Sequence, residues 1–480
     1  MDYNQLEPKK VFTYFKNISD IPRGSGNEEA VAKYVYETVT ALGHEAVMDD
    51  ANNVFVRAKA APGYEDRAPI MMQGHLDMVC EANRATRHDF LTDPIRLLLD
   101  GDRLHADGTT LGADDGVAVA VMLAILDSPE LPRPELECLF TTDEETGLTG
   151  MRAFDPSGVR SRRMLNLDSA TEGEAIVSCA GGVRSHVYFP YETAPVPEGY
   201  TVCTLSVGGL FGGHSGEDIH LGRTGAIAAF ARMLYAARKV CDIRLANVSG
   251  GSRDNAIPRE CSADAAVSDY AAFEAAVRAE EAKIRAELIA DDANFRVTLE
   301  SAEAGAFLTS ESSEKLIGLL RVLPNGVHGM NRMIPGLVET SSNLGVIRPA
   351  ENGNMFEIVV LSRSSVEAKI DDMEHRVECA AMLAGGTFEH INRYPGWDFT
   401  VGSPLQKLFL DTYRDLFGKE ARILGIHAGL ECGLLKNKVP DMDMISIAPD
   451  IRDLHSPDES LSVSSMARVW TLVCEMLKNA

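Results

Sequence analysis

The stretch from Ala68 to Asp77 constrains the fold of this 480-residue chain more than any other. Its apolar run, Ala-Pro-Ile-Met-Met, is typical of a buried strand, and Gly74-His75-Leu76-Asp77 follows almost at once. Because residues i and i+2 of a strand point to the same face, we expect His75 and Asp77 to project side by side. Open α/β sheets carry their sites at the carboxyl ends of strands. The pair therefore predicts a site, although a surface histidine beside a solvated aspartate would look the same.

More carboxylates and a second imidazole follow other predicted strands or open a predicted helix. Two of them, Glu144 and Glu145, follow the predicted strand 135–142. A mixture of imidazoles and carboxylates without a thiolate suits zinc, manganese or cobalt in a hydrolytic site. The further residues at such positions are Asp114, Asp115, Asp168, Asp450, Asp453 and His455.

This set of residues is large enough to hold two ions. One bridging carboxylate, with one histidine and one further carboxylate per ion, holds two metals ~3.5–4 Å apart in two-metal hydrolases. A left-over carboxylate is then needed as the base, and the consecutive Glu144 and Glu145 offer one for a metal and one for a proton. Each piece alone has a plain explanation, such as a solvated turn, or a helix cap in the case of Asp114. Their joint occurrence at strand ends favours a site.

The composition excludes some classes of partner. The chain carries 46 basic and 71 acidic residues, a formal net charge of −25, which argues against nucleic acid or an anionic membrane surface. Nine scattered cysteines without a C-x-x-C pair indicate cytosolic thiol usage. The N-terminus lacks the apolar core of a signal peptide, and no apolar run approaches the ~20 residues of a membrane span. We expect a cytoplasmic protein.

The order of predicted elements indicates two domains. Residues 1–183 alternate strands and helices, as does the segment 395–480, and this is typical of a mostly parallel α/β sheet. Between them, residues 184–394 show a weak repetition in element order. We predict a discontinuous catalytic domain with an inserted α+β domain of two ferredoxin-like β-α-β-β-α-β units.

Five motifs along the chain resemble the di-zinc aminopeptidase/carboxypeptidase/aminoacylase family of metallopeptidases. They are Gly-His75-Leu-Asp77, Gly-Ala-Asp114-Asp115-Gly, Asp-Glu144-Glu145-Thr-Gly, Asn-Leu-Asp168 and His455-Ser-Pro-Asp-Glu. Their order and spacing agree with the family over essentially the whole chain. Within it, the long insertion and the later motif His427-Ala-Gly-Leu-Glu431-Cys-Gly look like the aminoacyl-histidine dipeptidases, also called β-alanyl-histidine or cytosol non-specific dipeptidases.

The resemblance implies roles for the residues in these motifs. Glu144 would take the proton from the water between the two ions and pass it to the leaving amine. Asp77 would orient His75, and the Asp114–Asp115 peptide would be cis. For the metal ligands the resemblance implies His75 and Asp168 on one zinc, Glu145 and His455 on the other, and Asp114 bridging both.

In this family the inserted domain is a lid, and the resemblance assigns substrate contacts to it. His214, in Phe-Gly-Gly-His-Ser-Gly, would polarise the scissile carbonyl and stabilise the oxyanion. Asn255 would lie beside the substrate, and Arg363 would grip its carboxylate. His427 and Glu431 would frame its termini. A glycine-rich turn, a turn asparagine and an edge-strand arginine are the plain alternatives for the first three.

One feature departs from the common family pattern. Common members have a lid of one unit and dimerise through it, whereas this insertion looks doubled. A monomer would then suffice for catalysis, and a homodimer stays open.

The sequence therefore predicts a di-zinc dipeptidase, with manganese or cobalt as other possible metals. Its substrates would be unblocked dipeptides, with a preference for Xaa-His that includes β-Ala-His. An N-acyl-amino-acid deacylase and a tripeptidase on the same scaffold are the alternatives. A non-catalytic binding protein is disfavoured because Glu144 and Asp77 are both present.

Overall fold

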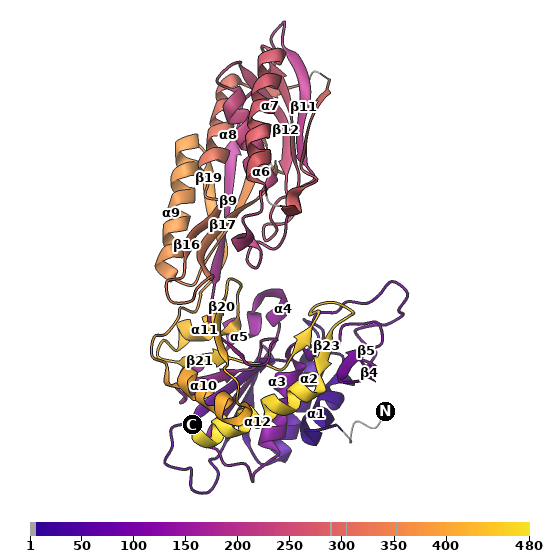
Figure 1. Ribbon diagram of the computed structural model, residues 1–480, viewed down its shortest axis with the longest axis vertical. Helices are drawn as coiled ribbons and strands as arrows, with labels where there is room; N and C mark the ends of the chain where they lie inside the picture. The colour runs from indigo at the N-terminus through magenta and orange to yellow at the C-terminus, as the bar shows by residue number, and fades with distance from the viewer. Residues whose placement is uncertain (1–5, 289, 304, 352) are drawn as a thin grey trace. The chain divides into compact units, whose positions relative to one another are not determined.

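The computed structural model describes residues 6–288, 290–303, 305–351 and 353–480, so positions 1–5, 289, 304 and 352 of the predicted domains lie outside it. The chain divides into two compact units (Figure 1). The first contains Met1–Ser178, Phe399–Gly425 and Leu430–Ala480, and the second contains Cys179–Asp398 and Ile426–Gly429. These boundaries lie within a few residues of 183/184 and 394/395. Nothing in the sequence indicated that residues 426–429 belong to the second unit.

An eight-stranded sheet forms the first unit, and its centre is parallel. The order is β1-β2-β6-β3-β7-β21-β8-β20. Strand β3 runs parallel to β6 and β7, and β21 runs parallel to β7, whereas β1, β2 and β8 join antiparallel. The expected parallel character thus holds for the centre only. The strands are β1 Glu45–Met48, β2 Val54–Ala58, β3 Ile70–His75, β6 Leu136–Thr141, β7 Arg163–Asn166, β8 Glu174–Cys179, β20 Arg422–Ile426 and β21 Asp443–Ser446.

The helices of this unit bury apolar faces against each other and the sheet. Helix α3 is apolar all round and almost wholly buried, because it packs against both α1 and strand β3. Helix α10 packs against α12 and β21. The helices are α1 Lys9–Ser19, α2 Glu29–Ala41, α3 Ala113–Leu126, α4 Glu144–Gly147, α5 Thr149–Ala153, α10 Pro404–Phe417, α11 Glu431–Lys438 and α12 Val463–Asn479.

A small second sheet, which the sequence did not predict, ties the last part of the chain to the first. Its order is β22-β23-β5-β4, with β22 Ile451–Arg452, β23 Ser460–Ser462, β5 Arg103–Ala106 and β4 Leu97–Asp100. Ser460 pairs with His105, so the segment around residue 455 is held from both sides by paired strands.

The second unit is built on one antiparallel sheet with the order β14-β11-β13-β12-β17-β18-β9-β19, and β16 pairs with β17. Two four-stranded halves meet where β12 pairs with β17. Each half follows the order β-α-β-β-α-β, but the second half takes its first strand, β9, from before the first half. The strands are β9 Gly181–Pro190, β11 Thr201–Gly208, β12 Ile243–Gly250, β13 Cys261–Val267, β14 Arg296–Ser301, β16 Gly326–Met330, β17 Val338–Pro349, β18 Met355–Ser364 and β19 Thr387–Tyr394. A separate short pair joins β10 Thr193–Ala194 to β15 Phe307–Leu308.

Four helices give this sheet a single continuous core. They are α6 Ala226–Ala237, α7 Tyr270–Glu287, α8 Ser310–Val322 and α9 Glu367–Ala384. Phe230 and Phe273 of one half and Leu320 and Val377 of the other belong to the same buried cluster. Both halves therefore contribute to one hydrophobic core.

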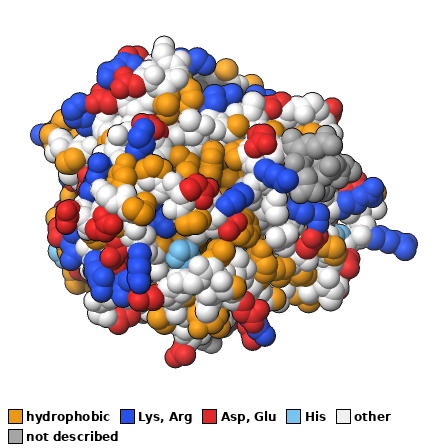
Figure 2. All heavy atoms as spheres, turned by 90° about the horizontal axis from the view of Figure 1, so that it is seen from below, with side chains coloured by type: hydrophobic (Ala, Val, Ile, Leu, Met, Phe, Trp, Pro, Cys, Tyr) orange, Lys and Arg blue, Asp and Glu red, His pale blue; other side chains and the backbone are white. Residues whose placement is uncertain are grey.

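Among the residues that the structure describes, no helix combines the length and the apolar character needed to cross a bilayer. On the face drawn in Figure 2, acidic and basic side chains are interspersed with apolar ones.

Candidate active site

The carboxyl ends of three adjacent parallel strands bring the predicted site residues together. His75, the last residue of β3, lies opposite Thr141 at the end of β6, and Gln73 lies opposite Asn166 at the end of β7. The chain then continues from β6 into Glu144 and from β7 into Asp168 within three residues. Parallel strands end at one edge of a sheet, so these side chains converge there.

His75 is almost fully buried, and its two ring nitrogens face different carboxylates. Nδ1 lies 3.2 Å from the carbonyl oxygen of Asp77 and 3.3 Å from its Oδ1. Nε2 lies 3.1 Å from Oδ1 of Asp114 and 3.9 Å from Oδ1 of Asp168. Asp77 thus holds one side of the ring and leaves the other directed at the remaining acids.

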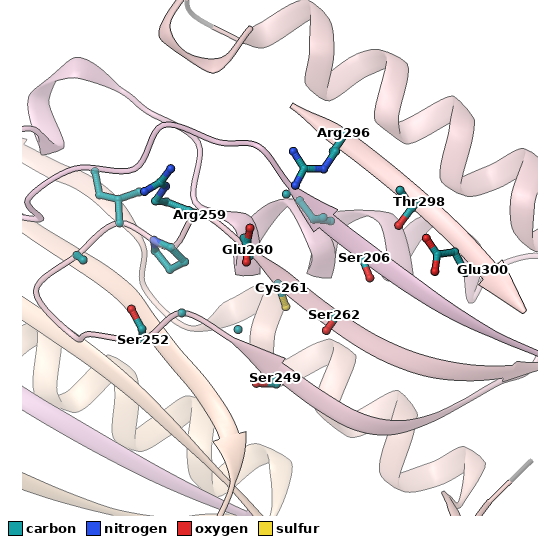
Figure 3. A pocket seen from close by; sticks show the side chains of 17 residues that line it. Ser206, Ser249, Ser252, Arg259, Glu260, Cys261, Ser262, Arg296, Thr298 and Glu300 are labelled. Carbon is teal, nitrogen blue, oxygen red and sulfur yellow. The ribbon is translucent and has the colours of Figure 1, made fainter. Parts of the chain in front are cut away.

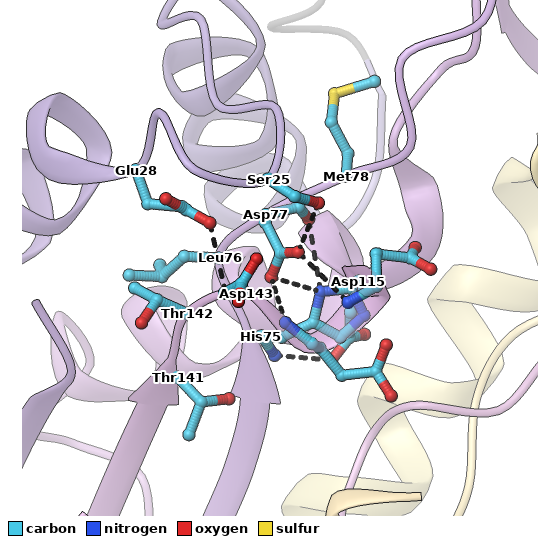
Figure 4. Close-up of polar contacts among 12 residues, drawn as sticks. Ser25, Glu28, His75, Leu76, Asp77, Met78, Asp115, Thr141, Thr142 and Asp143 are labelled. Atoms are coloured by element: carbon cyan, nitrogen blue, oxygen red, sulfur yellow. Dashed lines mark hydrogen bonds and ion pairs between the residues drawn. The ribbon is translucent and has the colours of Figure 1, made fainter. Parts of the chain in front are cut away.

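Both carboxylate oxygens of Asp77 accept hydrogen bonds. Its Oδ1 accepts a hydrogen bond from the backbone N–H of Glu144 at 3.1 Å, and Oδ2 accepts from that of Glu145 at 3.2 Å and from Ser25 Oγ at 2.8 Å (Figure 4). Burial opposes its charge, but hydrogen bonds from His75 and these donors outweigh it and lower the pKa of Asp77 to about 2. A carboxylate so occupied is suited to orienting His75 and the Glu144 turn.

Asp114 lies between the two imidazoles. Its Oδ1 contacts His75, and its Oδ2 lies 3.2 Å from Nε2 of His455. The same His455 nitrogen lies 3.2 Å from Oε1 of Glu145. Hydrogen bonds that His455 donates to these two carboxylates raise its pKa to about 11. The Asp114–Asp115 peptide bond is cis, as the resemblance implied.

The arrangement fits divalent cations. Among the described residues, two groups of ligand atoms lie close enough to hold a metal: His75 with Asp114 and Glu145, and His75 with Asp115 and Asp168. Burial, and then neighbouring carboxylates such as Asp114, raise the pKa of Asp168 well above its usual range, and its buried Oδ2 has no hydrogen-bond partner among the described residues. Several buried carboxyl groups lie close together here, and burial and mutual repulsion oppose their ionisation. A bound cation would offset this repulsion and let the carboxyl groups ionise.

Asp115 was not predicted as a ligand, and its surroundings differ from those of Asp114. Its Oδ2 accepts the backbone N–H of His75 at 3.1 Å. Gly74 is required beside it, because a Cβ there would lie 2.4 Å from that oxygen. Asp115 therefore anchors the end of β3 and also stands within reach of a metal.

Two supporting residues were missed by the sequence reasoning. The buried Glu459 carboxylate accepts hydrogen bonds from four consecutive backbone N–H groups, from Leu111 to Asp114, at 2.8–3.2 Å. Buried Arg23 donates to the carbonyl oxygens of Leu76, Asp77 and Gly112. Glu459 closes the His455-Ser-Pro-Asp-Glu motif, which was a usable signal, whereas Arg23 lies in no recognisable motif.

Glu431 and His427 lie in different units. Glu431 belongs to the first unit, is fully buried, and accepts hydrogen bonds from Thr141 Oγ1 at 2.6 Å and from Gln73. Burial raises its pKa to about 7. His427, in the second unit, contacts Ser341 Oγ at 2.7 Å. That the two residues frame a substrate stays a prediction.

The other predicted substrate-binding residues gather in the second unit with His427. Asn255 accepts the backbone N–H of Ser215 at 2.8 Å, beside an isolated bridge between His214 and Ala256. Burial, and then the charge of Arg363, lower the pKa of His214, and they lower that of His427 to about 3. The charge of Arg363 therefore acts on two histidines that are distant from it in sequence.

None of the predicted site residues lines a cavity of about 780 Å³ in the second unit (Figure 3). It lies over a row of hydroxyl side chains on adjacent strands, Thr298, Ser206 and Ser262, with Arg259 and Arg296 nearby. The size of a cavity alone does not locate the chemistry of this chain.

Comparisons with known proteins agree along the full length of the chain. A cytosol non-specific dipeptidase of Escherichia coli (strain K12) is 37% identical over 480 residues, covering 99% of each chain. The crystal structure of an aminoacylhistidine dipeptidase from Vibrio alginolyticus superposes with a TM-score of 0.94 at 35% identity, covering 100% of this chain and 98% of that one. An aminopeptidase PepT from Bacillus cereus has a TM-score of 0.59 at 15% identity over 98% of both chains, which shows a shared fold alone.

The family model that matches the chain includes every predicted metal ligand. It is the model of peptidase family M20/M25/M40, and it matches residues 71–479, from the strand that ends in His75 to the last helix. With these motifs, this fold and a relative similar from end to end, the chain belongs to peptidase family M20/M25/M40.

Proposed function

We propose that the chain is a metal-dependent dipeptidase that hydrolyses unblocked dipeptides and prefers Xaa-His, including β-Ala-His. The observation that carries this proposal is the end-to-end similarity to a cytosol non-specific dipeptidase and to an aminoacylhistidine dipeptidase. The name of the first relative also supports a cytoplasmic location.

Two divalent ions would be held in the first unit, and we propose zinc, with manganese or cobalt as other possibilities. The position of Asp114 between His75 and His455 supports a bridging role. Asp168 would complete one ion's ligands and Glu145 the other's. When bound, such ions supply Lewis-acid activation of the scissile carbonyl and of water.

Glu144 would serve as the general base and then as the general acid. Burial raises its pKa well above the usual range, and neighbouring acids such as Asp168 and Glu431 add to this. Its backbone N–H is held by Asp77, so the turn that carries it is fixed relative to His75. A carboxylate with a raised pKa can accept a proton from the attacking water and release it to the leaving amine near neutral pH.

The second unit would supply groups that bind the substrate and its transition state. A lowered pKa keeps His214 neutral near pH 7, so its N–H can donate to a developing oxyanion. Arg363 would bind the substrate carboxylate through its planar fork. Asn255, His427 and, in the first unit, Glu431 would complete the contacts with the dipeptide.

A substrate panel tests the proposal. Purified chain, loaded in turn with zinc, manganese or cobalt, is given Ala-His, β-Ala-His, N-acetyl-histidine and a tripeptide, and the released amino acids are quantified. The proposal predicts turnover of the free dipeptides. Selective turnover of the acetylated amino acid would identify a deacylase, and selective turnover of the tripeptide a tripeptidase. Two bound ions without any turnover would identify a binding protein.

A further inference from the structure

Arg363 lies in a cross-strand row of the second unit. On β17, β18, β9 and β19 the paired residues are Ser341, Arg363, Gly182 and Tyr394. Directly opposed residues of adjacent strands project from the same face of a sheet. The row therefore presents an arginine and a tyrosine on one face, with a glycine between them.

Gly182 leaves the gap in which the two long side chains meet. Nη1 of Arg363 donates a hydrogen bond to the hydroxyl of Tyr394 at 2.8 Å, across the intervening strand. A Cβ at Gly182 would lie 2.8 Å from the Tyr394 hydroxyl, closer than real Cβ atoms come, and 3.0 Å from Cζ. A side chain at this position would therefore displace the ring from Arg363.

A β-bulge puts the tyrosine in this row. Ile391 pairs with Arg184, but three residues later Tyr394 pairs with Gly182, so β19 contains one extra residue. Asn392, within this bulge, has a φ of 52°, a left-handed conformation that asparagine tolerates well. In an unbroken ladder Arg393 would stand opposite Gly182. Bulges commonly re-aim a side chain in this way.

The segment Ile426–Gly429, which belongs to the second unit, contacts both ends of the row. His427 contacts the hydroxyl of Ser341 at 2.7 Å, and a Cβ at Gly429 would lie 3.0 Å from the ring of Tyr394. Arg363 is 6% exposed, and its Nε has no hydrogen-bond partner among the described residues. A buried guanidinium with a free N–H, held on one side by a hydroxyl, is prepared for an anion.

We propose that Tyr394 is a positioning residue for Arg363: its hydroxyl fixes the guanidinium in the orientation that the proposed contact with the dipeptide's carboxylate needs. This inference rests on the proposed dipeptidase function. Tyr394 orients the guanidinium, Gly182 makes room for the contact, and the bulge in β19 sets the register.

The test compares L-alanyl-L-histidine with its C-terminal carboxamide as substrates of the metal-loaded chain. Tyr394→Phe is expected to raise KM for the free acid about tenfold, because a hydrogen bond to a charged group is lost. It should leave kcat within about twofold and leave KM for the carboxamide unchanged. In the Arg363→Met background, Tyr394→Phe should have no further effect on either substrate.

Two more variants separate positioning from general stability. Gly182→Ala keeps the hydroxyl but displaces it, and should reproduce the selective rise in KM. Tyr188→Phe is the matched control, because it removes another cross-strand hydroxyl contact, to Glu389 at 2.7 Å, from the same sheet. Melting temperatures show whether each variant is folded. If Tyr394→Phe does not fold, the KM values of Gly182→Ala decide the test. An equal rise for acid and carboxamide, or no rise, overturns the inference. A wild-type chain that cleaves no dipeptide contradicts the proposed function instead.

Discussion

The pKa of a buried histidine is shifted in opposite directions in the two units. In the first unit burial disfavours charge on His75, yet Asp114 and Asp77 outweigh it and raise its pKa well above the usual value. In the second unit burial and the charge of Arg363 act together, and they lower the pKa of His427 to about 3. Surrounding carboxylates make the first imidazole part of a cation site. Burial and a neighbouring guanidinium keep the second imidazole neutral.

This contrast indicates how the chemistry is divided between the units. The strand ends of the first unit collect negative charge that a metal can neutralise. The second unit presents neutral imidazoles and an arginine, which suit carbonyl and carboxylate oxygens of a peptide. Experiments that change one kind of charge without the other test this division.

The largest effect is expected from losing the cations of the first unit. Chelation should reduce kcat/KM to background. His75→Ala should remove one of two bound ions, the one that we propose His75 and Asp168 hold, because Nε2 of His75 and Oδ1 of Asp168 lie 3.9 Å apart. Metal content by mass spectrometry and dipeptide turnover measure this. His105→Ala, in the small sheet of the same unit, should retain both ions. Full activity of the metal-free chain would refute a cation site.

Glu144→Gln should come next, because it removes the proposed base and keeps its shape. We expect kcat to fall about 10³-fold while both ions stay bound. The matched control is Asp143→Asn, since Asp143 has a φ of 52° that asparagine tolerates, and it should change kcat by less than about threefold. Near-normal kcat in Glu144→Gln would assign the proton transfer to another group.

In the second unit, Arg363→Met should act on binding. We expect KM for free dipeptides to rise about 100-fold, with no loss of metal, because a buried charge-assisted contact with the carboxylate is removed. Arg348→Met, which removes an exposed arginine paired with Glu357 on the same sheet, should leave KM unchanged. Loss of metal in Arg363→Met would contradict the division between the units.

A smaller effect is expected for Asp77→Asn. Residues that orient a metal-binding histidine typically contribute about tenfold or more to metal affinity. The variant should therefore lose metal at lower chelator concentrations and show weaker activity, with KM nearly unchanged. Asp443→Asn, which changes another carboxylate with serine and backbone donors in the same unit, is the control. Unaltered metal affinity would show that Asp77 does not support His75.

The smallest effect is a pH dependence of stability in the second unit. An unfolded histidine has a pKa of about 6.5, whereas that of folded His427 is about 3. Its neutral form therefore contributes stability fully above pH 6.5, and this is lost as the pH falls from 6.5 towards 3. By pH 5 the loss is about 2 kcal/mol.

Denaturant titrations at pH 7 and pH 5 measure this loss in a Trp470→Phe background. Fluorescence then reports from buried Trp397 in the second unit. Between pH 7 and pH 5, the free energy of unfolding should fall less in His427→Asn than in the protein with His427, since asparagine takes up no proton. Equal losses in both proteins would show that His427 is not neutral through burial.

The same contrast explains what could be predicted from the sequence. In the first unit several predicted ligands lie at strand ends, so local motifs predict the site: His75 is the last residue of β3, and Asp168 follows β7. No local pattern marks Arg23. Glu459 stands in the His455-Ser-Pro-Asp-Glu motif, but its contacts with the backbone of Leu111 to Asp114 depend on tertiary approach and could not be predicted.

In the second unit the order of elements hides the topology. Strand β9 is central to one half, yet it precedes the other half in the chain, so a linear pattern cannot assign it to its sheet. The pairing of Gly182 with Tyr394 likewise depends on a bulge and on two segments about 210 residues apart. Motifs identified His214 and Arg363, but the contacts that hold Arg363 required the structure.

The most direct test of the account is the rate at which the metal-loaded chain releases histidine from L-alanyl-L-histidine. We expect turnover that chelation abolishes and that metal restores. A chain that holds its metal ions and leaves this and other free dipeptides intact would contradict it.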